Sequence, residues 1–211
     1  MAAGLRHGHT FLQLSDLRGY ANLLFDMADE DPRLWALIEG VEAFNHEIIR
    51  RYLDIGVDLV TFPEDLGMQS GPMLSPTDFR KYIKPSYKRM MRSAQDKNVP
   101  IHMHSDGDIR LLVDDIVDSG VAVVNLQDLV NGVDWIRRTL RGRVCVELDI
   151  DRQRVTPFGS PKDIDDLIRG EVEALACPDG GLCLIFGLYP GTPMENAAAV
   201  MDAMERWAQI Y

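Results

Sequence analysis

The sequence predicts an α/β fold of the β/α-barrel type, built from about six strand–helix units. Short runs of Val, Ile and Leu alternate with longer segments whose apolar residues recur every three or four positions, as expected for strands alternating with helices. A helix-to-strand junction occurs twice, at Asp54–Val60 and Asp118–Val124, where a glycine suited to a helix C-terminus precedes a β-branched run. Such alternation, with right-handed crossovers, leaves a β/α barrel or a doubly wound sheet.

The elements can be placed in order along the chain. We expect strands near residues 10–15, 57–63, 99–104, 121–127, 143–149 and 181–187. We expect helices near residues 33–54, 76–97, 108–119, 132–141, 161–176 and 193–209. Three of the helices should begin at a hydroxyl cap followed by proline and an acid, at Ser75, Ser160 and Thr192.

The number of units predicts an incomplete barrel. The even spacing of the strands at 99, 121 and 143 favours a barrel over an open sheet. A complete (β/α)8 TIM barrel has eight units and typically about 250 residues. Six units in 211 residues therefore resemble a barrel without its first two, and nothing divides residues 1–211 into more than a single domain.

Charge and composition narrow the class of partner. The net charge of -11 argues against nucleic acid or an anionic membrane surface as the main partner. No signal sequence or membrane-spanning run is evident, and three cysteines without CxxC spacing suggest neither a disulfide framework nor a cysteine-only zinc site. We expect a cytoplasmic protein, and an unpaired sheet edge would favour a homo-oligomer.

The most informative segment is Val99–Gly107, where an apolar strand ends in polar side chains. Alternation places His102 and His104 on one face, and Asp106 follows at the turn. Ligands bind at the carboxyl ends of parallel strands, so this is a candidate site, although a hydrogen-bonded structural corner explains the same residues. Acids and imidazoles at other strand ends would complete a ring able to bind a divalent metal. The ring consists of Glu64, Asp65, His102, His104, Asp128, Glu147, Asp149 and Asp151.

Four segments resemble the uroporphyrinogen decarboxylase superfamily, which also contains zinc-dependent methyltransferases that transfer methyl groups from corrinoid proteins to thiols. The segments are Gly56–Gly67, Leu74–Pro85, Pro100–Gly107 and Gly180–Asn196, in family order. The Ser-Pro-x-x-Phe segment at Ser75 and the final Gly-Gly…Pro-x-x-Glu-Asn are the more specific. The resemblance implies a β/α barrel; the two opening units, which supply tetrapyrrole-binding arginines and an aspartate in the decarboxylases, have no counterpart here.

At two positions this sequence departs from the patterns of that superfamily. Phe186 stands where the decarboxylases have a histidine, and the His-x-Cys-Gly motif of the methyltransferases here begins at His104 and has Asp106 in place of cysteine. Strand alternation predicts that Cys183 is a packed core residue and not a substitute ligand. We interpret His7 and His9 as part of an N-terminal tail.

The resemblance implies decarboxylation of a tetrapyrrole or related substrate, without a cofactor. Asp65, Glu64 and Asp106 are then the candidate catalytic residues, and Tyr20, Gln127, Asp151 and Tyr189 the candidate substrate-binding residues. The alternative is a zinc-dependent, corrinoid-linked methyltransferase whose metal ligands would be His104, Asp106 and Glu64, acting with a methyl-donor substrate or a corrinoid protein. A third possibility, suggested by Phe186 and the missing units, is a catalytically degenerate barrel subunit.

Overall fold

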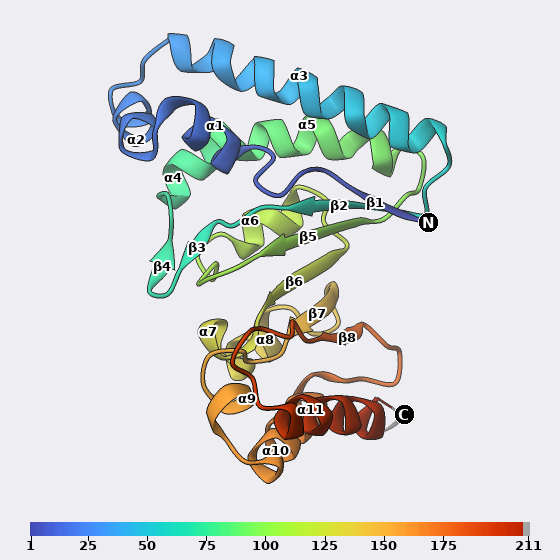
Figure 1. Cartoon of the computed structure of the whole chain (residues 1–211). Helices are drawn as coiled ribbons and strands as arrows, with labels where there is room; N and C mark the ends of the chain where they lie inside the picture. Colours follow the sequence, from blue (N-terminus) through green and yellow to red (C-terminus); the bar gives the residue numbers. More distant parts are fainter. Residues whose placement is uncertain (209–211) are drawn as a thin grey trace. The chain divides into compact units, whose positions relative to one another are not determined.

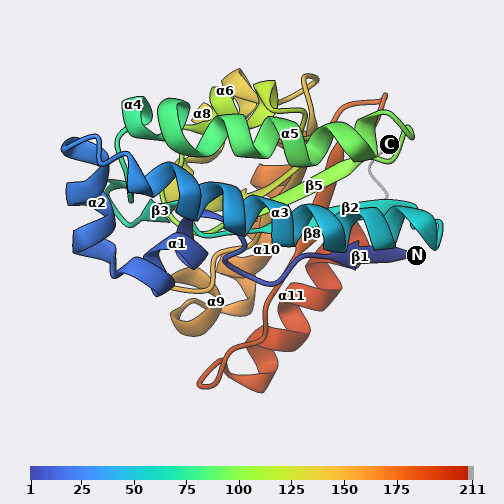
Figure 2. The same cartoon turned by 90° about the horizontal axis from the view of Figure 1, so that it is seen from above.

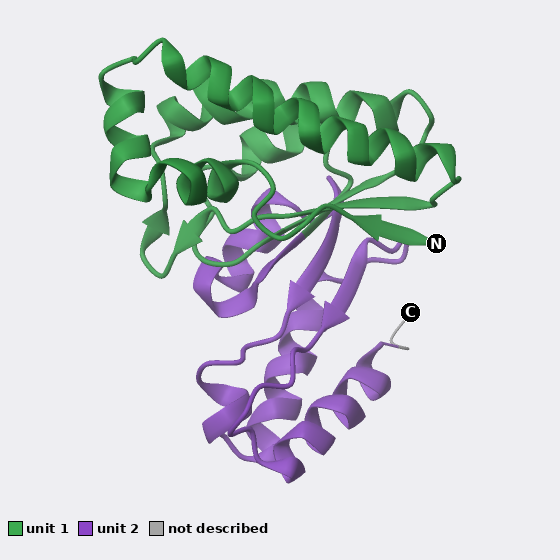
Figure 3. Cartoon of the chain, turned by 45° about the horizontal axis from the view of Figure 1, so that its top comes forward, with its two compact units in different colours: residues 1–124 green, residues 125–211 purple. Residues whose placement is uncertain are grey.

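A computed structural model describes residues 1–208 and divides the chain into two compact units, residues 1–124 and 125–211 (Figure 3). In chain order the strands of barrel type are β1 (Ala2–Gly4), β2 (Leu59–Pro63), β5 (Ile101–Ser105), β6 (Val123–Gln127), β7 (Cys145–Asp149) and β8 (Leu182–Ile185). Each of these strands is followed by at least one helix. The predicted α/β class with six strand–helix units is therefore confirmed.

The first unit contains one edge of the parallel sheet, β1, and the longest helix, α3 (Figure 1). Strand β2 lies between β1 and β5 and runs parallel to both. The helices of this unit are α1 (Phe11–Arg18), α2 (Tyr20–Ala28), α3 (Arg33–Asp54), α4 (Pro76–Asp78), the π-helical segment η1 (Phe79–Ile83), α5 (Lys84–Gln95) and α6 (Val113–Asp118). A short antiparallel hairpin, β3 (Gly67–Met68) with β4 (Gly71–Pro72), follows β2.

Helices α3 and α5 lie side by side and cover the strands of the first unit (Figures 1 and 2). Ile38 and Ile49 on α3 and Met90 on α5 are fully buried, as the three- and four-residue apolar spacing predicts. Glu42 of α3 accepts hydrogen bonds from Ser86 and Arg89 of α5, which joins the two helices on their outer side. This helical layer supports strands β2 and β5, and the candidate site described below lies at the carboxyl ends of these two strands.

The second unit pairs β7 with β8 in parallel and packs helices against them. Its helices are α7 (Asp128–Asn131), α8 (Val133–Thr139), α9 (Val155–Phe158), α10 (Pro161–Leu175) and α11 (Met194–Trp207). Its core combines Ile168 of α10, Val200 of α11 and Leu148 of β7, all fully buried. Strand β6 contains the boundary between the two units, which falls between residues 124 and 125.

The predicted helix boundaries are mostly confirmed, with one exception. Ser75 and Ser160 accept hydrogen bonds from the backbone N–H groups of Asp78 and Asp163, and Ser160 forms a complete capping box. At the third predicted cap the helix begins one residue later, at Met194, and the side chain of Thr192 caps nothing. The proline after Thr192 occupies the cap position itself and cannot accept a hydrogen bond through its side chain.

The strand predicted over residues 10–15 is wrong, because this segment forms helix α1. Phe11 and Leu14 are both fully buried, and their three-residue spacing fits one face of a helix, whereas in a strand the two side chains would point to opposite faces. The Glu64 carboxylate accepts hydrogen bonds from the N–H groups of Thr10 and Leu12 at the start of the helix. This distant cap, which local sequence does not reveal, stabilises the helical conformation. The first strand is instead Ala2–Gly4.

Among residues 1–208, no helix combines the length and apolar character that a membrane span requires.

Candidate functional site

The candidate site of the first unit lies where β2 and β5 end together. The two strands pair in parallel with Pro63 opposite His104, and the Glu64 N–H donates to the His104 carbonyl at 2.9 Å. Asp65 follows the end of β2, and Asp106 follows the end of β5. The register therefore brings Asp65, His104 and Asp106 together, as predicted for residues at the carboxyl ends of neighbouring parallel strands.

A third chain segment contributes His7, which sequence reasoning assigned to a tail. The segment after β1 continues alongside β2, with hydrogen bonds from Leu5 N–H to the Thr61 carbonyl and from Gly8 N–H to the Pro63 carbonyl. His7 Nε2 consequently lies 3.3 Å from Asp65 Oδ1, and His104 Nε2 lies 3.5 Å from the same oxygen. We call His7, Asp65 and His104 the His–Asp cluster.

The loops that hold the cluster are locked to each other by close backbone contact. Gly107 has a φ of 79°, and a Cβ on it would lie 2.2 Å from the carbonyl carbon of Gly67. The Asp108 N–H donates to the Met68 carbonyl at 2.7 Å, and Leu66 N–H donates to Ser105 Oγ at 2.9 Å. The Gly107 of the strand-end motif is thus needed both for its conformation and for its lack of a side chain.

Asp65 is anionic in this environment. Burial acts to raise its pKa, but the hydrogen bond from His104, the Asp106 N–H at 3.1 Å and the charge of His7 together lower the pKa to about 2. Asp106 lies at the rim, with its Oδ1 3.7 Å from His104 Nε2. The cluster therefore presents a fixed negative charge between two imidazoles, with a second carboxylate beside it.

The spacing of the cluster fits a divalent metal. One ligand atom from each of His7, Asp65 and His104 lies within 4.8 Å of the others, and no other such group of three occurs among the described residues. A tetrahedral zinc ion with bonds of about 2.1 Å holds its ligand atoms about 3.4 Å apart. The His7–Asp65 and His104–Asp65 distances of 3.3 and 3.5 Å match that separation. Three protein ligands with a fourth position open are typical of catalytic zinc.

Glu64 does not belong to the cluster, although it is adjacent to Asp65 in sequence. Its side chain is fully buried, accepts hydrogen bonds from the N–H groups of Thr10 and Leu12 and from the Tyr87 hydroxyl, and lies 3.8 Å from His9 Nε2. Burial raises the pKa of Glu64 to about 7 and lowers that of His9 to about 3, so His9 is neutral near pH 7. The structure thus places Glu64 at the start of α1, away from the predicted metal ligands His104 and Asp106.

Tyr20 also occupies a structural position. It begins α2 instead of following a strand, and its hydroxyl donates to the Met73 carbonyl at 2.5 Å. Its ring packs edge-on against Phe11 with ring centroids 6.3 Å apart. The hydrogen bond to Met73 joins α2 to the loop after the β3–β4 hairpin, and the ring contact joins α2 to α1.

The other predicted substrate-binding residues belong to the second unit. Gln127 ends β6 and is buried, and its carbonyl accepts a hydrogen bond from Asn131. Asp151 is buried and accepts hydrogen bonds from the N–H groups at positions 153, 154 and 155, so it orders the turn into α9. Tyr189 is half exposed, and the guanidinium of Arg152 lies 5.0 Å from its ring centre.

The second unit contains a buried group of acids that includes Glu171, a residue the sequence did not single out. The N–H of Asp151 donates to Asp128 Oδ2 at 2.7 Å, and the carboxyl oxygens of Glu171 on α10 are buried without a hydrogen-bond partner among the described residues. Burial, and then the charges of Asp128 and Asp151, raise the pKa of Glu171 to about 10. Burial also raises the pKa of Asp128. Glu171 therefore holds a proton near pH 7.

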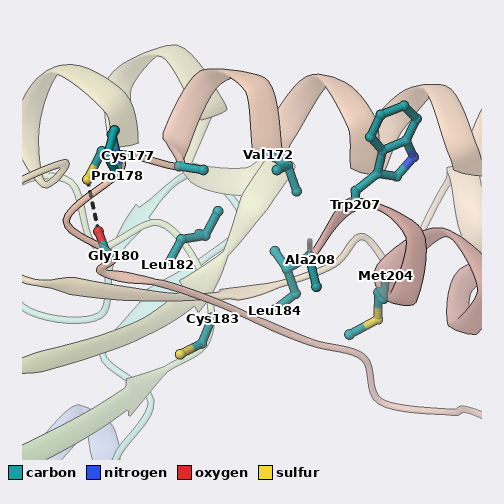
Figure 4. Close-up of a pocket in the computed structure, with 11 residues that line it drawn as sticks. Val172, Cys177, Pro178, Gly180, Leu182, Cys183, Leu184, Met204, Trp207 and Ala208 are labelled. Carbon is teal, nitrogen blue, oxygen red and sulfur yellow. Dashed lines mark hydrogen bonds between the residues drawn. The ribbon is translucent and has the colours of Figure 1, made fainter. Parts of the chain in front are cut away.

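An apolar cavity of about 420 Å³ lies elsewhere in the second unit, between β8, α10 and α11 (Figure 4). Leu182, Leu184, Val172 and Trp207 line it, and none of the His–Asp cluster does. Cys183, expected to be packed in the core, is exposed and points to the other side of β8 from Leu182 and Leu184 (Figure 4). The prediction that Cys183 and Leu184 point to opposite sides of the strand is correct, but the side on which Cys183 lies is exposed to solvent.

Comparison with known proteins identifies relatives over most of the chain. The model of the family described as uroporphyrinogen decarboxylase (URO-D) matches residues 11–207. The uroporphyrinogen decarboxylase of Thermus thermophilus is 31% identical over 193 residues, which cover 83% of this chain and 52% of that relative. The uroporphyrinogen decarboxylase of Geotalea daltonii is 24% identical over 184 residues, 82% of this chain and 49% of that relative. The chain spans about half the length of the curated relatives it matches.

A solved structure shares the fold. A methyltransferase from Methanosarcina mazei superposes on 98% of this chain and 58% of its own, with a TM-score of 0.74 and 18% sequence identity. This likeness confirms the incomplete barrel fold. His7 precedes the residues that the family model matches, which is why a comparison with family motifs did not find it.

Proposed function

Because the chain belongs to the uroporphyrinogen decarboxylase family, we propose that it is a metal-dependent enzyme of that family in which His7, Asp65 and His104 bind zinc. The reaction we propose is transfer of a methyl group to a thiol, with a methylated corrinoid as the donor. The observation that carries this proposal is that both imidazole-to-Asp65 separations match those of tetrahedral zinc and that all three ligand atoms lie within 4.8 Å of one another.

The residues of the site divide the work. A bound zinc ion would lower the pKa of a thiol at its open position, so that the thiolate is available at neutral pH. His7 and His104 would donate their Nε2 lone pairs, and Asp65 is already anionic because its pKa is lowered to about 2. Asp106, whose Oδ1 lies 3.7 Å from His104 Nε2, would accept the proton that the thiol releases. In the transfer, the sulfur–carbon bond forms as the donor–carbon bond breaks, and the corrinoid keeps the electron pair.

A second candidate is decarboxylation of a tetrapyrrole, the function named for the Thermus relative at 31% identity. It would use Asp65 or Asp106 as the carboxylate that stabilises a protonated pyrrole, and it would need no metal. The net charge of -11 and the acidic cluster disfavour a substrate with many carboxylates. We therefore place this function second.

Metal content tests the first proposal directly. The purified chain is incubated with zinc, dialysed, and measured by elemental analysis beside His7→Ala, His104→Ala and His46→Ala. His46 is the matched control because it is a surface histidine that hydrogen-bonds to Ser93 and is not part of the His–Asp cluster. We expect about one zinc per chain in the wild type and in His46→Ala, and loss of zinc in the other two variants.

Two activity assays separate the candidates. Methyl transfer from methylcobalamin to a small thiol, lost on chelation and restored by zinc, would support the first proposal. Zinc-independent turnover of uroporphyrinogen would support the second. A wild type that retains no zinc after loading overturns the metal-dependent proposal. Stoichiometric zinc without either activity would support the degenerate, non-catalytic barrel.

A further inference from the structure

Two cysteine thiols in the second unit lie close enough to suggest a disulfide bond, and neither thiol has a role in the proposed function. Cys145 of β7 and Cys183 of β8 lie on neighbouring parallel strands, and their Sγ atoms are 4.0 Å apart. The register pairs Cys183 with Glu147, two residues after Cys145, so both thiols project from the same face of the strand pair. We propose that Cys145 and Cys183 form a reversible intramolecular disulfide when the protein meets an oxidised low-molecular-weight disulfide.

Closure would join two sulfur atoms that are already close to each other. A disulfide bond is about 2.05 Å long, and rotation about the Cα–Cβ bonds of the two residues can shorten the present 4.0 Å separation. Because the register pairs Cys183 with Glu147 and not with Cys145, the two Cα atoms are diagonal neighbours, and closure also requires the start of β7 to shift toward β8. The strand pairing thus presents the two sulfurs to each other before oxidation.

Access favours Cys183 as the first sulfur to react. Cys183 is exposed and Cys145 is partly buried. Figure 4 shows the Cys183 side chain on the opposite side of β8 from Leu182 and Leu184, although Cys183 is among the residues that line the cavity. Burial, and then the neighbouring Cys183 and Glu147, raise the pKa of Cys145 to about 11, which keeps this second thiol protonated near pH 7.

The reaction balances with oxidised glutathione as the oxidant. The Cys183 thiolate attacks one sulfur of glutathione disulfide, the sulfur–sulfur bond breaks, and one glutathione leaves as a thiolate that takes a proton from water. The Cys145 thiolate then attacks Cys183 Sγ and expels the second glutathione, which is protonated in turn. The protein loses two electrons and two protons, and one glutathione disulfide becomes two thiols. The second step should accelerate as pH rises, because Cys145 must be deprotonated.

Closure would fix the shortest barrel-type strand of the second unit. The two cysteines are 38 residues apart in sequence, and β8 has four residues. A cross-link over a loop of this length restricts the unfolded chain and secures β8 against β7. Because Leu182 and Leu184 form a wall of the apolar cavity, the disulfide would also fix that wall.

The test uses the full chain, reduced, freed of metal with a chelator, diluted and treated with oxidised glutathione. Intact mass, free-thiol titration and peptide mapping without reductant are then recorded from pH 7 to pH 9. We expect two of the three thiols to disappear without added glutathione mass, and a linked peptide pair containing Cys145 and Cys183, with closure faster at the higher pH. Reduction should restore all three thiols.

Cys177 provides the matched control within the same unit, because its thiol donates to the Gly180 carbonyl and not to another cysteine. Cys177→Ser should form the same disulfide as the wild type. Cys145→Ser and Cys183→Ser should each fail to form it, and Cys145→Ser should accumulate a glutathione adduct on Cys183. Wild-type protein that gains only glutathione adducts, or that links Cys183 between two chains, would overturn the proposal.

Discussion

Acidic side chains follow the strands in both units, but the groups around them differ. In the first unit Asp65 faces His7 and His104 and is anionic, with a pKa of about 2. In the second unit Asp128, Asp151 and Glu171 face one another inside the protein, and Glu171 holds a proton because its pKa is raised to about 10. The sequence placed Asp65, Asp128 and Asp151 in one ring of metal-compatible residues.

The difference shows that the partner of a carboxylate decides its chemistry more than its position at a strand end does. Imidazoles favour the charged form of the carboxylate, and here the three possible ligand atoms lie within 4.8 Å of one another, as metal binding requires. Buried carboxylates without cations repel one another, so a shared proton is the lower-energy solution. We therefore propose that the metal-binding residues lie in the first unit and that the acids of the second unit have a structural role.

The largest effect should come from removing the central charge of the cluster. Asp65→Asn keeps the shape of the side chain but removes the anion that lies between His7 and His104. We expect zinc affinity to fall by more than about 100-fold, since changes to groups outside the ligand shell alone cost up to about that factor. Competition with a fluorescent zinc chelator measures the affinity.

Glu171→Gln is the control from the other unit, and its zinc affinity should equal that of the wild type. If Asp65→Asn binds zinc as tightly as the wild type does, the negative charge of Asp65 does not contribute to zinc binding, and the proposed difference between the two acidic groups is wrong.

The next largest effect concerns Glu64, the acid that does not join the cluster. Glu64→Ala leaves the N–H groups of Thr10 and Leu12 and the Tyr87 hydroxyl without their acceptor in a fully buried location. We expect a loss of about 3 kcal/mol in the free energy of unfolding of the first unit. Hydrogen exchange measured by mass spectrometry should show the loss first in peptides covering α1.

Glu64→Gln tests the same site with less disruption, because the amide oxygen still accepts the backbone N–H groups. It should lose much less stability than Glu64→Ala. Equal destabilisation by the two variants would mean that the negative charge of Glu64, and not its oxygen atoms, supports α1.

The third effect is a pH dependence confined to the second unit. The pKa of Glu171 is raised from 4.5 to about 10 in the folded state, so its contribution to stability is complete below pH 4.5 and is lost as pH rises toward 10. Glu171→Gln replaces the buried carboxyl group with an amide that does not titrate. We expect the variant to be more stable than the wild type at pH 8, by on the order of 2 kcal/mol.

Tryptophan fluorescence in urea can follow this unit if Trp35, which lies in the first unit, is replaced by phenylalanine in both proteins. The remaining Trp135 and Trp207 then report on the second unit. If the free energy of unfolding changes with pH in the same way for both proteins between pH 5 and pH 9, Glu171 does not hold a proton in the folded state.

Local sequence was sufficient for most of the fold, and long-range contacts explain where it failed. The helix at 33–54 and the strands near 57–63 and 99–104 were predicted nearly to the residue, because each has a clear apolar period and a glycine or capping signal at its end. The segment 10–15 was mistaken for a strand because Glu64, more than fifty residues away, supplies the cap of α1. Alternation correctly placed Cys183 opposite Leu184, but could not reveal that this face of the strand pair is open.

The site followed the same rule. Asp65, His104 and Asp106 were predicted together because parallel strands β2 and β5 end at the same level. His7 was missed because no local signal shows that the segment after β1 runs beside β2; Leu5 and Gly8 establish this only through hydrogen bonds to Thr61 and Pro63. Glu171 was missed because a glutamate on a helix is normally exposed, and its burial depends on the neighbouring Asp128.

The smallest effect compares the helix caps of the two units. Ser160 takes part in a reciprocal capping box, accepting from Asp163 N–H while the Asp163 carboxylate accepts from the Ser160 N–H at 2.8 Å. Ser75 accepts from the Asp78 N–H at 3.0 Å and donates its hydroxyl to the Asp78 carboxylate. Ser160→Ala should destabilise the second unit by about 1 kcal/mol, and Ser75→Ala the first unit by about half as much. Ser160→Ala should cost more because two backbone N–H groups are affected. The Asp163 N–H loses its acceptor, and the Asp163 carboxylate that accepts from the N–H of residue 160 is no longer oriented by the Ser160 hydroxyl. Urea unfolding of each variant measures both losses, and a greater loss in Ser75→Ala would mean that the π-helical turn after α4 depends on its cap more than the 15-residue α10 depends on its own.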